Sequence, residues 1–481
     1  MTVVINGIED LTAETVVRVA WEGERCELGA AAIEAIRWRR KEFEAFVTEN
    51  RDQRLYGITT RHHVGAKTLL DAEARAEFAR RLPSTPATIG TPLPERLVRT
   101  IVLTRLSDVL NGTACLRPDT AERLVRMLDT TLPPVFATGN GEPGDIIALG
   151  QLFRGHFDGT LQIGEGMALI NGSPVAAAAL CDAVLSGGPR VHTVERALAL
   201  GATAARAPAA HFSAELGALW KDPHQEASLR VVRELTERAD RSAELPHQAP
   251  VSFRSGPRLA GWMRRAQATA EECVAIVLTA SSNNPVFVGP RESPPHGAIL
   301  SNGGYHNPMV SAVLDSLARA WADMAQLITA QVNRLVEDPA GLARTEPEAQ
   351  ISLLHMTSAG WAEEARAAVG TPSLTGLGCA GQTDTSTVDL LAWRKATAAG
   401  VALDNTAAIL SIVAAHTAAA RGLDIPPGLS DMHNAVLAAL PVDTAPLDFA
   451  DRIAKVVDIA HRAGRSPDST TRANIHPVTL R

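Results

Sequence analysis

Residues 308–338 read PMVSAVLDSLARAWADMAQLITAQVNRLVED, and this stretch decides the fold class. Its apolar side chains recur every three or four positions, which is the spacing of one face of an α-helix. They are Val310, Val313, Leu314, Leu317, Trp321, Met324, Leu327 and Ile328. A proline opens the stretch and Pro339 follows it, as expected for the first turn and the end of a helix. Such a helix would be roughly 45 Å long, which is long for a globular protein.

Three other Ala- and Leu-rich stretches predict long helices, at residues 259–281, 347–369 and 386–421. Long helices of this kind bury one another's faces in a bundle. Residues 1–200 are instead broken often by Gly and Pro, and helical pieces such as 30–50 alternate with loops. We therefore predict a mainly α fold in one continuous structural unit. Residues 1–200 form a loop-rich N-terminal region with active-site loops, and residues 201–481 form a long-helix bundle with an extended tail, SPDSTTRANIHPVTLR.

Composition narrows the class of protein. The chain has 481 residues, only 4% of them aromatic, so its core is expected to be aliphatic. A net charge of −7 gives no basic face for nucleic acid, and no apolar run approaches the roughly 18 residues of a membrane span. The N-terminus is acidic and lacks the pattern of a secretion signal. Five widely spaced cysteines indicate buried thiols in the cytoplasm rather than disulfides or a zinc site: Cys26, Cys115, Cys181, Cys273 and Cys379.

The loop TGNGEPGD at residues 138–145 has the spacing G-x-G-x-x-G of a dinucleotide site. That pattern is meaningful only between a buried strand and a helix. Here LPPVFA precedes it, and two prolines there and Pro143 within the turn argue against a strand–turn–helix unit. The loop needs another explanation.

Tyrosine is scarce in this chain, which contains only Tyr56 and Tyr305. Both lie in glycine-flanked loops, LYGITT and NGGYHNP, outside any apolar stripe. A tyrosine in a loop is more often an ordinary surface residue, but the scarcity favours a selected role. The reference pKa of a phenol, near 10, falls beside a cation or a hydrogen-bond donor, which makes the group a possible general base.

Further polar groups lie in the stretches HQAPVSFRSGPR, GEGMALINGSP, SSNNPVF and TTRHHVGAK, which we interpret as loops. Arg254 in the first is suited to hold a carboxylate through a planar two-pronged contact. The amides of these loops could equally cap a helix or close a turn. The pair His62 and His63 has no carboxylate or cysteine at ligand spacing, which disfavours a metal site.

Taken together, these loops resemble the aromatic amino acid lyases, the family of histidine and phenylalanine ammonia-lyases. The likeness runs from VVINGIEDLTAE near the N-terminus to about residue 420. The family motifs Y-G-I-N-T-G-F-G, L-L-N-G-T, Q-D-x-Y-S-x-R, S-x-D-N-P, G-N-F-H and N-Q-E-D are matched in order by YGITTRHH, LINGS, QAPVSFR, SSNNP, GGYH and GQTD. The resemblance implies the ammonia-lyase or fumarase-like fold, a bundle of long helices with an irregular N-terminal region. It also implies a homotetramer whose active sites are shared between subunits.

The loop at 138–145 departs from the family. There an Ala-Ser-Gly triad cyclises, two waters leave, and the serine becomes the methylidene of an electrophilic imidazolone that activates the substrate amine. The aligned residues here are Glu142, Pro143 and Gly144, followed by the retained Asp145. Pro143 has no hydroxyl to eliminate, and its nitrogen is already part of a ring. The methylidene-imidazolone therefore cannot form, and no cofactor is expected.

Three other family positions are changed, because Val251 replaces the second tyrosine, Thr383 the acid of N-Q-E-D, and Thr85 the imidazole contact of histidine lyases. The resemblance thus implies an enzyme that keeps a base and a carboxylate contact but cannot activate ammonia. A quaternary ammonium leaves without such help, as in ergothionase-like members that release trimethylamine from a betaine. The predicted catalytic residues are Tyr56, Glu142 and Tyr305, and the predicted substrate contacts are Arg254, Asn171, Gln248, Thr85, His62, His63, Asn284, Thr383 and Gln382.

Glu142 would attract a trimethylammonium group and the ring of Tyr305 would add a cation–π contact. Alternatively, Glu142 caps the helix that begins near Asp145. Two other functions stay open: a cofactor-free biosynthetic lyase, cyclase or conjugate-addition catalyst on another carboxylate substrate, and a catalytically silent homologue that binds a carboxylate ligand or a partner.

Overall fold

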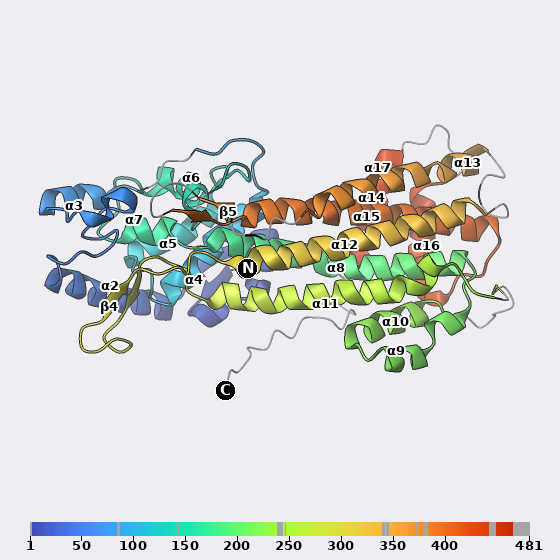
Figure 1. Cartoon of the computed structure of the whole chain (residues 1–481), viewed down its shortest axis with the longest axis horizontal. Helices are drawn as coiled ribbons and strands as arrows, with labels where there is room; N and C mark the ends of the chain where they lie inside the picture. The colour runs from blue at the N-terminus through green and yellow to red at the C-terminus, as the bar shows by residue number, and fades with distance from the viewer. Residues whose placement is uncertain are drawn as a thin grey trace.

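The computed structural model describes residues 2–83, 87–141, 144–237, 244–245, 247–338, 342, 346–370, 374, 376–378, 383–441 and 449–464. Helices dominate these residues, as the sequence predicts, and an elongated bundle carries a region of shorter elements at one end (Figure 1). The elements that come before the long bundle helices are, in chain order, β1 (Thr2–Ile5), α1 (Ala13–Val16), β2 (Arg25–Leu28), α2 (Ala30–Glu49), α3 (Ala72–Ala79), α4 (Glu95–Leu110), α5 (Pro118–Arg126), α6 (Ile146–Phe157) and α7 (Glu165–Ile170). Strands β1 and β2 pair in parallel, with Val3 opposite Cys26.

Long helices run side by side through the bundle (Figure 1). They are α8 (Pro174–Ala204), α11 (Val251–Thr279), α12 (Pro308–Val336), α14 (Leu354–Ala368) and α15 (Asp389–Ala420). The remaining helices are α9 (Ala214–Trp220), α10 (Pro223–Leu235), α13 (Glu346–Ser352), α16 (Pro427–Ala439) and α17 (Phe449–Gly464). Two small hairpins, β3 (Val286–Val288) with β4 (Ala298–Leu300) and β5 (Gly376–Leu377) with β6 (Thr385–Ser386), lie outside the bundle core.

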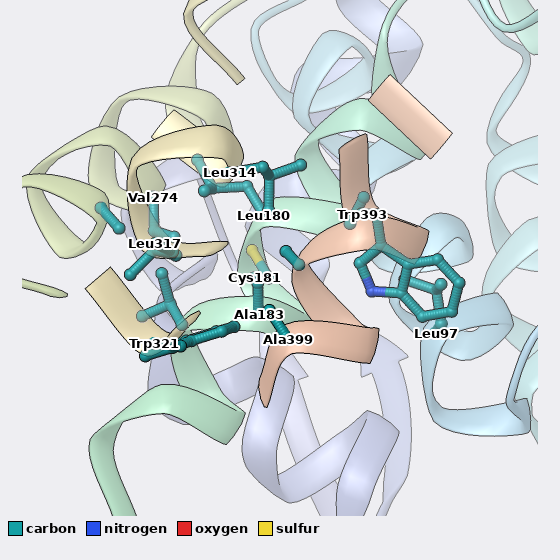
Figure 2. Close-up of a cluster of buried hydrophobic side chains, with 14 of the residues drawn as sticks. Leu97, Leu180, Cys181, Ala183, Val274, Leu314, Leu317, Trp321, Trp393 and Ala399 are labelled. Atoms are coloured by element: carbon teal, nitrogen blue, oxygen red, sulfur yellow. The ribbon is translucent and has the colours of Figure 1, made fainter. Parts of the chain in front are cut away.

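Helix α8 lies at the centre and packs against α4, α11, α12 and α15. A run of buried alanines, 176–179, lets these neighbours approach closely. Figure 2 shows Leu180 and Cys181 of α8 between α12, which contributes Leu314, and α15, which contributes Trp393. One hydrophobic cluster extends from Val3 to Val456, so the N-terminal region and the bundle share a core.

The predicted helix at 308–338 is confirmed as α12, which ends at Val336, and the helices at 30–50 and 386–421 are confirmed as α2 and α15. The predicted helix at 347–369 is two helices, α13 and α14, that meet near Leu353. Long helices begin earlier than residue 200, because α8 already starts at Pro174.

Two stretches interpreted as loops are largely helical, and those interpretations were wrong. Helix α11 begins at Val251, eight residues before the predicted start, so Arg254 lies on a helix. Pro250 precedes its first residue, and Pro257 lies inside it, buried. From the sequence alone, this proline suggests that the helix is interrupted. Packing against the surrounding helices keeps α11 continuous although Pro257 lacks a backbone N–H. Likewise, residues 165–170 of GEGMALINGSP form α7.

Four of the five cysteines are described, and all four are free and buried: Cys26, Cys115, Cys181 and Cys273. Burial raises the pKa of the first three to about 12. Cys379 and the tail from residue 466 lie outside the described residues.

The expectation that no apolar run suits a membrane needs a correction. Segment 165–204 and helix α15 are each long and apolar enough to cross a bilayer, by length and composition. However, 94% and 83% of their apolar windows are buried in the protein. They are core helices of the bundle.

Candidate active site

Three of the motifs meet at the end of the bundle where α8 begins. Gly144 is in the left-handed region, with φ of 76°, and its carbonyl accepts a hydrogen bond from the Gly172 N–H at 3.4 Å. A Cβ added to Gly144 would lie 2.9 Å from Asn171 Oδ1 and 3.1 Å from the Cβ of Tyr305. The structure therefore places Gly144, Asn171 and Tyr305 in direct proximity, although they are far apart in sequence.

Asp145 holds this loop to the first turn of α8. Its carboxylate accepts hydrogen bonds from the N–H groups of Val175, at 2.8 Å, and Ala176, at 3.3 Å. The positive end of the helix dipole favours a carboxylate here. Asp145 itself has φ of 52°, an uncommon conformation for a residue other than glycine. The backbone at Gly144 and Asp145 is thus fixed in a left-handed turn over Asn171.

The SSNNP segment supports the loop that carries Tyr305. Asn284 is buried, and its Oδ1 accepts from Asn302 N at 3.0 Å and from Ser301 Oγ at 3.3 Å. In return, Asn302 Nδ2 donates to the carbonyl of Asn283 at 3.1 Å. The visible role of Asn284 is therefore to order the 301–305 loop.

The loop of Tyr56 packs against α7, the short helix that Asn171 follows. Tyr56 is half-buried, and the next residue, Gly57, has φ of 67°. A Cβ on Gly57 would lie 2.7 Å from the Cγ of Met167 in α7, so only glycine fits between the loop and the helix. The Tyr56 loop and Asn171 are consequently held by one element.

Arg61 and His62 follow Tyr56 and flank the ring of Phe78 on α3. The Cζ of Arg61 lies 5.8 Å from the ring centroid, and the His62 ring lies 6.0 Å from it. His63 begins a 3₁₀ turn, His63–Lys67. Phe78 therefore lies close to the side chains of both Arg61 and His62.

Arg254 and Gln248 lie at the opposite end of the bundle, at the start of α11. From Arg254 to the end of α11 the helix runs roughly 38 Å, and the SSNNP segment follows directly. Arg254 Nε donates to the Ala249 carbonyl at 2.9 Å, and in the part of the chain described its terminal nitrogens bond no protein acceptor. Gln248 is exposed, as is Val251, the position of the second family tyrosine. One chain alone does not bring Arg254 to Tyr56.

The positive charge of Arg254 affects the pKa of His211. Burial and this nearby guanidinium lower the pKa of His211, whose Nε2 accepts from the Ala249 N–H at 3.0 Å. Among the described residues the terminal nitrogens of Arg254 bond no acceptor, which suits a carboxylate ligand.

Thr383 lies in the turn between β5 and β6, just before α15 begins. The first residue of α15, Asp389, is only 3% exposed, and burial raises the pKa of its carboxyl to about 7. Hydrogen bonds from the Thr387 side chain and the Ser311 backbone oppose that rise. Asp389 thus connects the segment of Thr383 to the first turn of α12, which follows the Tyr305 loop.

Comparison with known proteins agrees with this arrangement. The sequence profile of the aromatic amino acid lyases matches residues 11–157 and 155–441. The chain belongs to the aromatic amino acid lyase family. Histidine ammonia-lyase of Caldanaerobacter subterraneus subsp. tengcongensis is 26% identical over 364 residues, which cover 69% of this chain and 70% of that protein. Histidine ammonia-lyase of Streptococcus pyogenes serotype M1 is 26% identical over 367 residues, 70% of each chain.

Solved structures of similar proteins share the fold of this aromatic amino acid lyase. Tyrosine aminomutase from Streptomyces globisporus superposes with a TM-score of 0.84 at 20% identity, covering 96% of this chain and 97% of that one. Ergothionase from Treponema denticola, an ergothioneine-degrading enzyme solved with desmethyl-ergothioneine sulfonic acid, gives a TM-score of 0.78 at 15% identity, covering 96% and 99%. The predicted ammonia-lyase fold is thereby confirmed, and family membership supports a lyase activity.

Several predicted site residues of this lyase lie outside the described residues: Glu142, Thr85 and Gln382, together with Pro143. Among the residues that are described, no group of three or more His, Cys, Asp or Glu side chains could hold a metal ion.

Sequence reasoning missed a buried ion pair on α4, Arg105 with Asp108. Both side chains are fully buried, and burial lowers the pKa of Arg105. Arg105 donates to the Asn171 carbonyl at 3.2 Å, and Asp108 accepts from the Ser282 N–H at 2.7 Å. The signal was present in IVLTRLSDVL, where two opposite charges three residues apart interrupt an apolar run.

Proposed function

We propose that this protein is a cofactor-independent lyase that removes a β-proton from a carboxylate substrate and releases trimethylamine from an α-trimethylammonium acid. One observation carries the proposal. The loop that supplies the family's electrophile is kept against Asn171 and Tyr305, yet two residues of its triad are Glu142 and Pro143. Membership of the family and a fold shared with an ergothioneine-degrading enzyme support it.

The proposal that no methylidene-imidazolone forms rests on the chemistry of position 143. Cyclisation needs a side-chain hydroxyl that leaves as water and a backbone nitrogen that becomes an imine, and proline offers neither. Gly144, which would supply the attacking nitrogen, retains its place beside Asn171. The substrate must therefore carry a leaving group that departs unaided.

The reaction then needs three functions from the protein. Arg254 holds the carboxylate of the substrate through charge-assisted hydrogen bonds. Tyr56, as phenolate, takes the proton from the β-carbon, whose bonding electrons form the double bond to the α-carbon. The C–N bond breaks with its electron pair on nitrogen, so a quaternary ammonium leaves as neutral trimethylamine. The Tyr305 ring and the Glu142 carboxylate attract the cation before it leaves.

A homotetramer with shared active sites is part of this proposal. Tyr56 and Arg254 are both needed, yet α11 separates the Arg254 end of the bundle from the SSNNP segment by roughly 38 Å within one chain. A second copy that supplies Arg254 to the loop end would complete the site. Four free, buried thiols support a reducing, cytoplasmic location.

A second candidate function follows from the changed specificity positions. Thr85 and Thr383 replace residues that would face an imidazole, so the side chain of the substrate is not tied to histidine chemistry. The second candidate is a biosynthetic elimination, cyclisation or conjugate addition on another carboxylate substrate, again with Tyr56 as base. A silent, ligand-binding homologue is the third.

The test is a panel of α-trimethylammonium acids with different side chains, each paired with its parent α-amino acid as a control. Free trimethylamine and the absorbance of a conjugated acid are measured. We expect trimethylamine from one or more betaines and no ammonia from the amino acids. Ammonia released from an amino acid would contradict the proposal. Release from neither set would favour the second or third candidate.

A further inference from the structure

Helix α4 contacts the loop of Asn171, which lies beside Gly144, and the SSNNP segment, and it places its only fully buried ion pair, among the residues described, against both of them. We propose that Arg105 and Asp108 are positioning residues that hold loop 171–173 and loop 281–284 in fixed relation to each other. The link between the loops is a property of the fold. Its effect on catalysis rests on the proposed lyase function.

The carboxylate of Asp108 binds two backbone N–H groups and one hydroxyl of loop 281–284. Its Oδ1 accepts from Ser282 N at 2.7 Å and from Asn283 N at 2.9 Å, and its Oδ2 accepts from Ser282 Oγ at 3.0 Å. Ser282 Oγ in turn accepts from the Ser173 N–H of the other loop at 3.0 Å. A chain of hydrogen bonds therefore runs from α4 through Ser282 to loop 171–173.

Arg105 binds the other loop directly. Its Nη1 donates to the Asn171 carbonyl at 3.2 Å, and a Cβ added to Gly172 would lie 2.7 Å from the same nitrogen. A side chain at position 172 would therefore have to displace Arg105 or Ser282, whose Oγ lies 2.9 Å from the same added Cβ. Arg105 thus holds the backbone of Asn171. The side chain of Asn171 lies toward Gly144.

The charges around Arg105 and Asp108 explain why substitution of either residue should disturb the loops. Arg105 feels two carboxylates, Asp108 and Asp145, and each carboxylate receives backbone N–H groups from a different segment. Since Arg105 and Asp108 have no solvent contact, loss of either removes the charge that directly pairs with the other in a buried site. A cavity of about 40 Å³ lined by Ser173, Ser282 and Gly304 lies alongside, so the loops have space to shift once released.

The main experiment compares Asp108→Ala with Asp404→Ala. Asp404 pairs with Arg190 and is also buried, but it lies about 23 Å along α15 from the start of that helix. Hydrogen exchange is measured at the Ser173, Ser282 and Asn283 amides, and kcat and KM are measured with a betaine that the wild type converts. We expect Asp108→Ala to speed exchange at these amides and to lower kcat about 100-fold, the scale of a small misplacement. KM should change little, because Arg254 binds the carboxylate elsewhere.

Two further variants keep the test decisive if Asp108→Ala folds poorly. Ser282→Ala removes the hydroxyl bridge without a charge and should lower kcat about fivefold, with faster exchange at Ser173 only. Asp108→Asn keeps an accepting oxygen and should restore part of the exchange protection. Unchanged exchange at all three amides in Asp108→Ala, or equal changes in Asp404→Ala, would overturn the proposal. If no substrate is converted by the wild type, the exchange data alone still decide whether the loops are linked.

Discussion

Tyr56 is the residue on which the proposed chemistry depends most. The variant Tyr56→Phe keeps the aromatic ring and removes only the oxygen, so it should fold and bind. General-base assistance is typically worth 10²- to 10⁴-fold, and we expect turnover to fall by about that factor. Steady-state kinetics with a converted betaine is the measurement. Elimination at the wild-type rate would show that another group is the base, with His62 the next to be replaced.

Arg254 offers a second test at the same scale. Replacing Arg254 with Met removes charge-assisted hydrogen bonds to the substrate carboxylate, worth about 1.5–3 kcal/mol, or roughly 10- to 150-fold in kcat/KM. The matched control is Arg258→Met, one turn further along α11, where the guanidinium lies 5.0 Å from the Trp220 ring centroid. The assignment would fail if both variants, correctly folded, kept the wild-type kcat/KM.

The sequence was informative about individual residues where chemistry and scarcity coincide. Two tyrosines in 481 residues, each in a glycine-flanked loop, pointed to the loops that lie near Asn171. Scarcity does not single out Arg105 and Asp108, because charged residues are common. In an apolar helix such residues are normally assigned to the solvent-exposed face. Only the packing shows that both are buried and that their partners are loop amides distant in sequence.

At the scale of elements, the pH dependence of stability should follow Asp389 at the start of α15. Burial raises the pKa of this carboxyl from 3.8 to about 7, so the folded protein holds a proton that the unfolded chain loses. The stabilising contribution is fully present below about pH 4 and is lost as the pH rises through about 7. Asp389→Asn should remove this dependence and raise the free energy of unfolding at pH 8 by up to a few kcal/mol.

Denaturant unfolding of both proteins between pH 5 and 8 measures this effect. Asp404→Asn is an unsuitable control because it breaks an ion pair, whereas Asp424→Asn changes a carboxyl for which no partner among the described residues is seen. A parallel pH dependence in wild type and Asp389→Asn would contradict the role assigned to Asp389.

Element boundaries show why part of the fold was predictable and part was not. Helix α12 has an uninterrupted apolar stripe, begins with Pro308 and is followed in the sequence by Pro339, so its sequence defines it. Helix α11 carries Pro257 in its interior, and its first two turns depend on burial of Phe253 and Gly256 in the bundle rather than on local preference. The small strands β5 and β6, two residues each, depend on a pairing that no periodicity reveals.

At the scale of the whole molecule, the proposed sharing of active sites between copies makes a specific prediction about mixed assemblies. Tyr56→Phe and Arg254→Met should each have a strongly reduced kcat/KM alone. Co-expressed and purified together, they should regain part of the wild-type turnover, because a site that takes Tyr56 from one copy and Arg254 from another can be intact. Light scattering reports the assembly, and turnover reports the sites. No recovery in mixed assemblies would place both residues of each site on one chain.

The conformation of Gly144 has a consequence for what this site could be engineered to do. Its left-handed backbone and its place beside Asn171 are features that an internal cyclisation at this loop could use. Two substitutions, Glu142→Ala and Pro143→Ser, would give the chain the Ala-Ser-Gly triad of the family. If the remaining scaffold suffices, the double variant will lose two waters in its intact mass and gain the ability to deaminate an ordinary amino acid, turning one lyase into another.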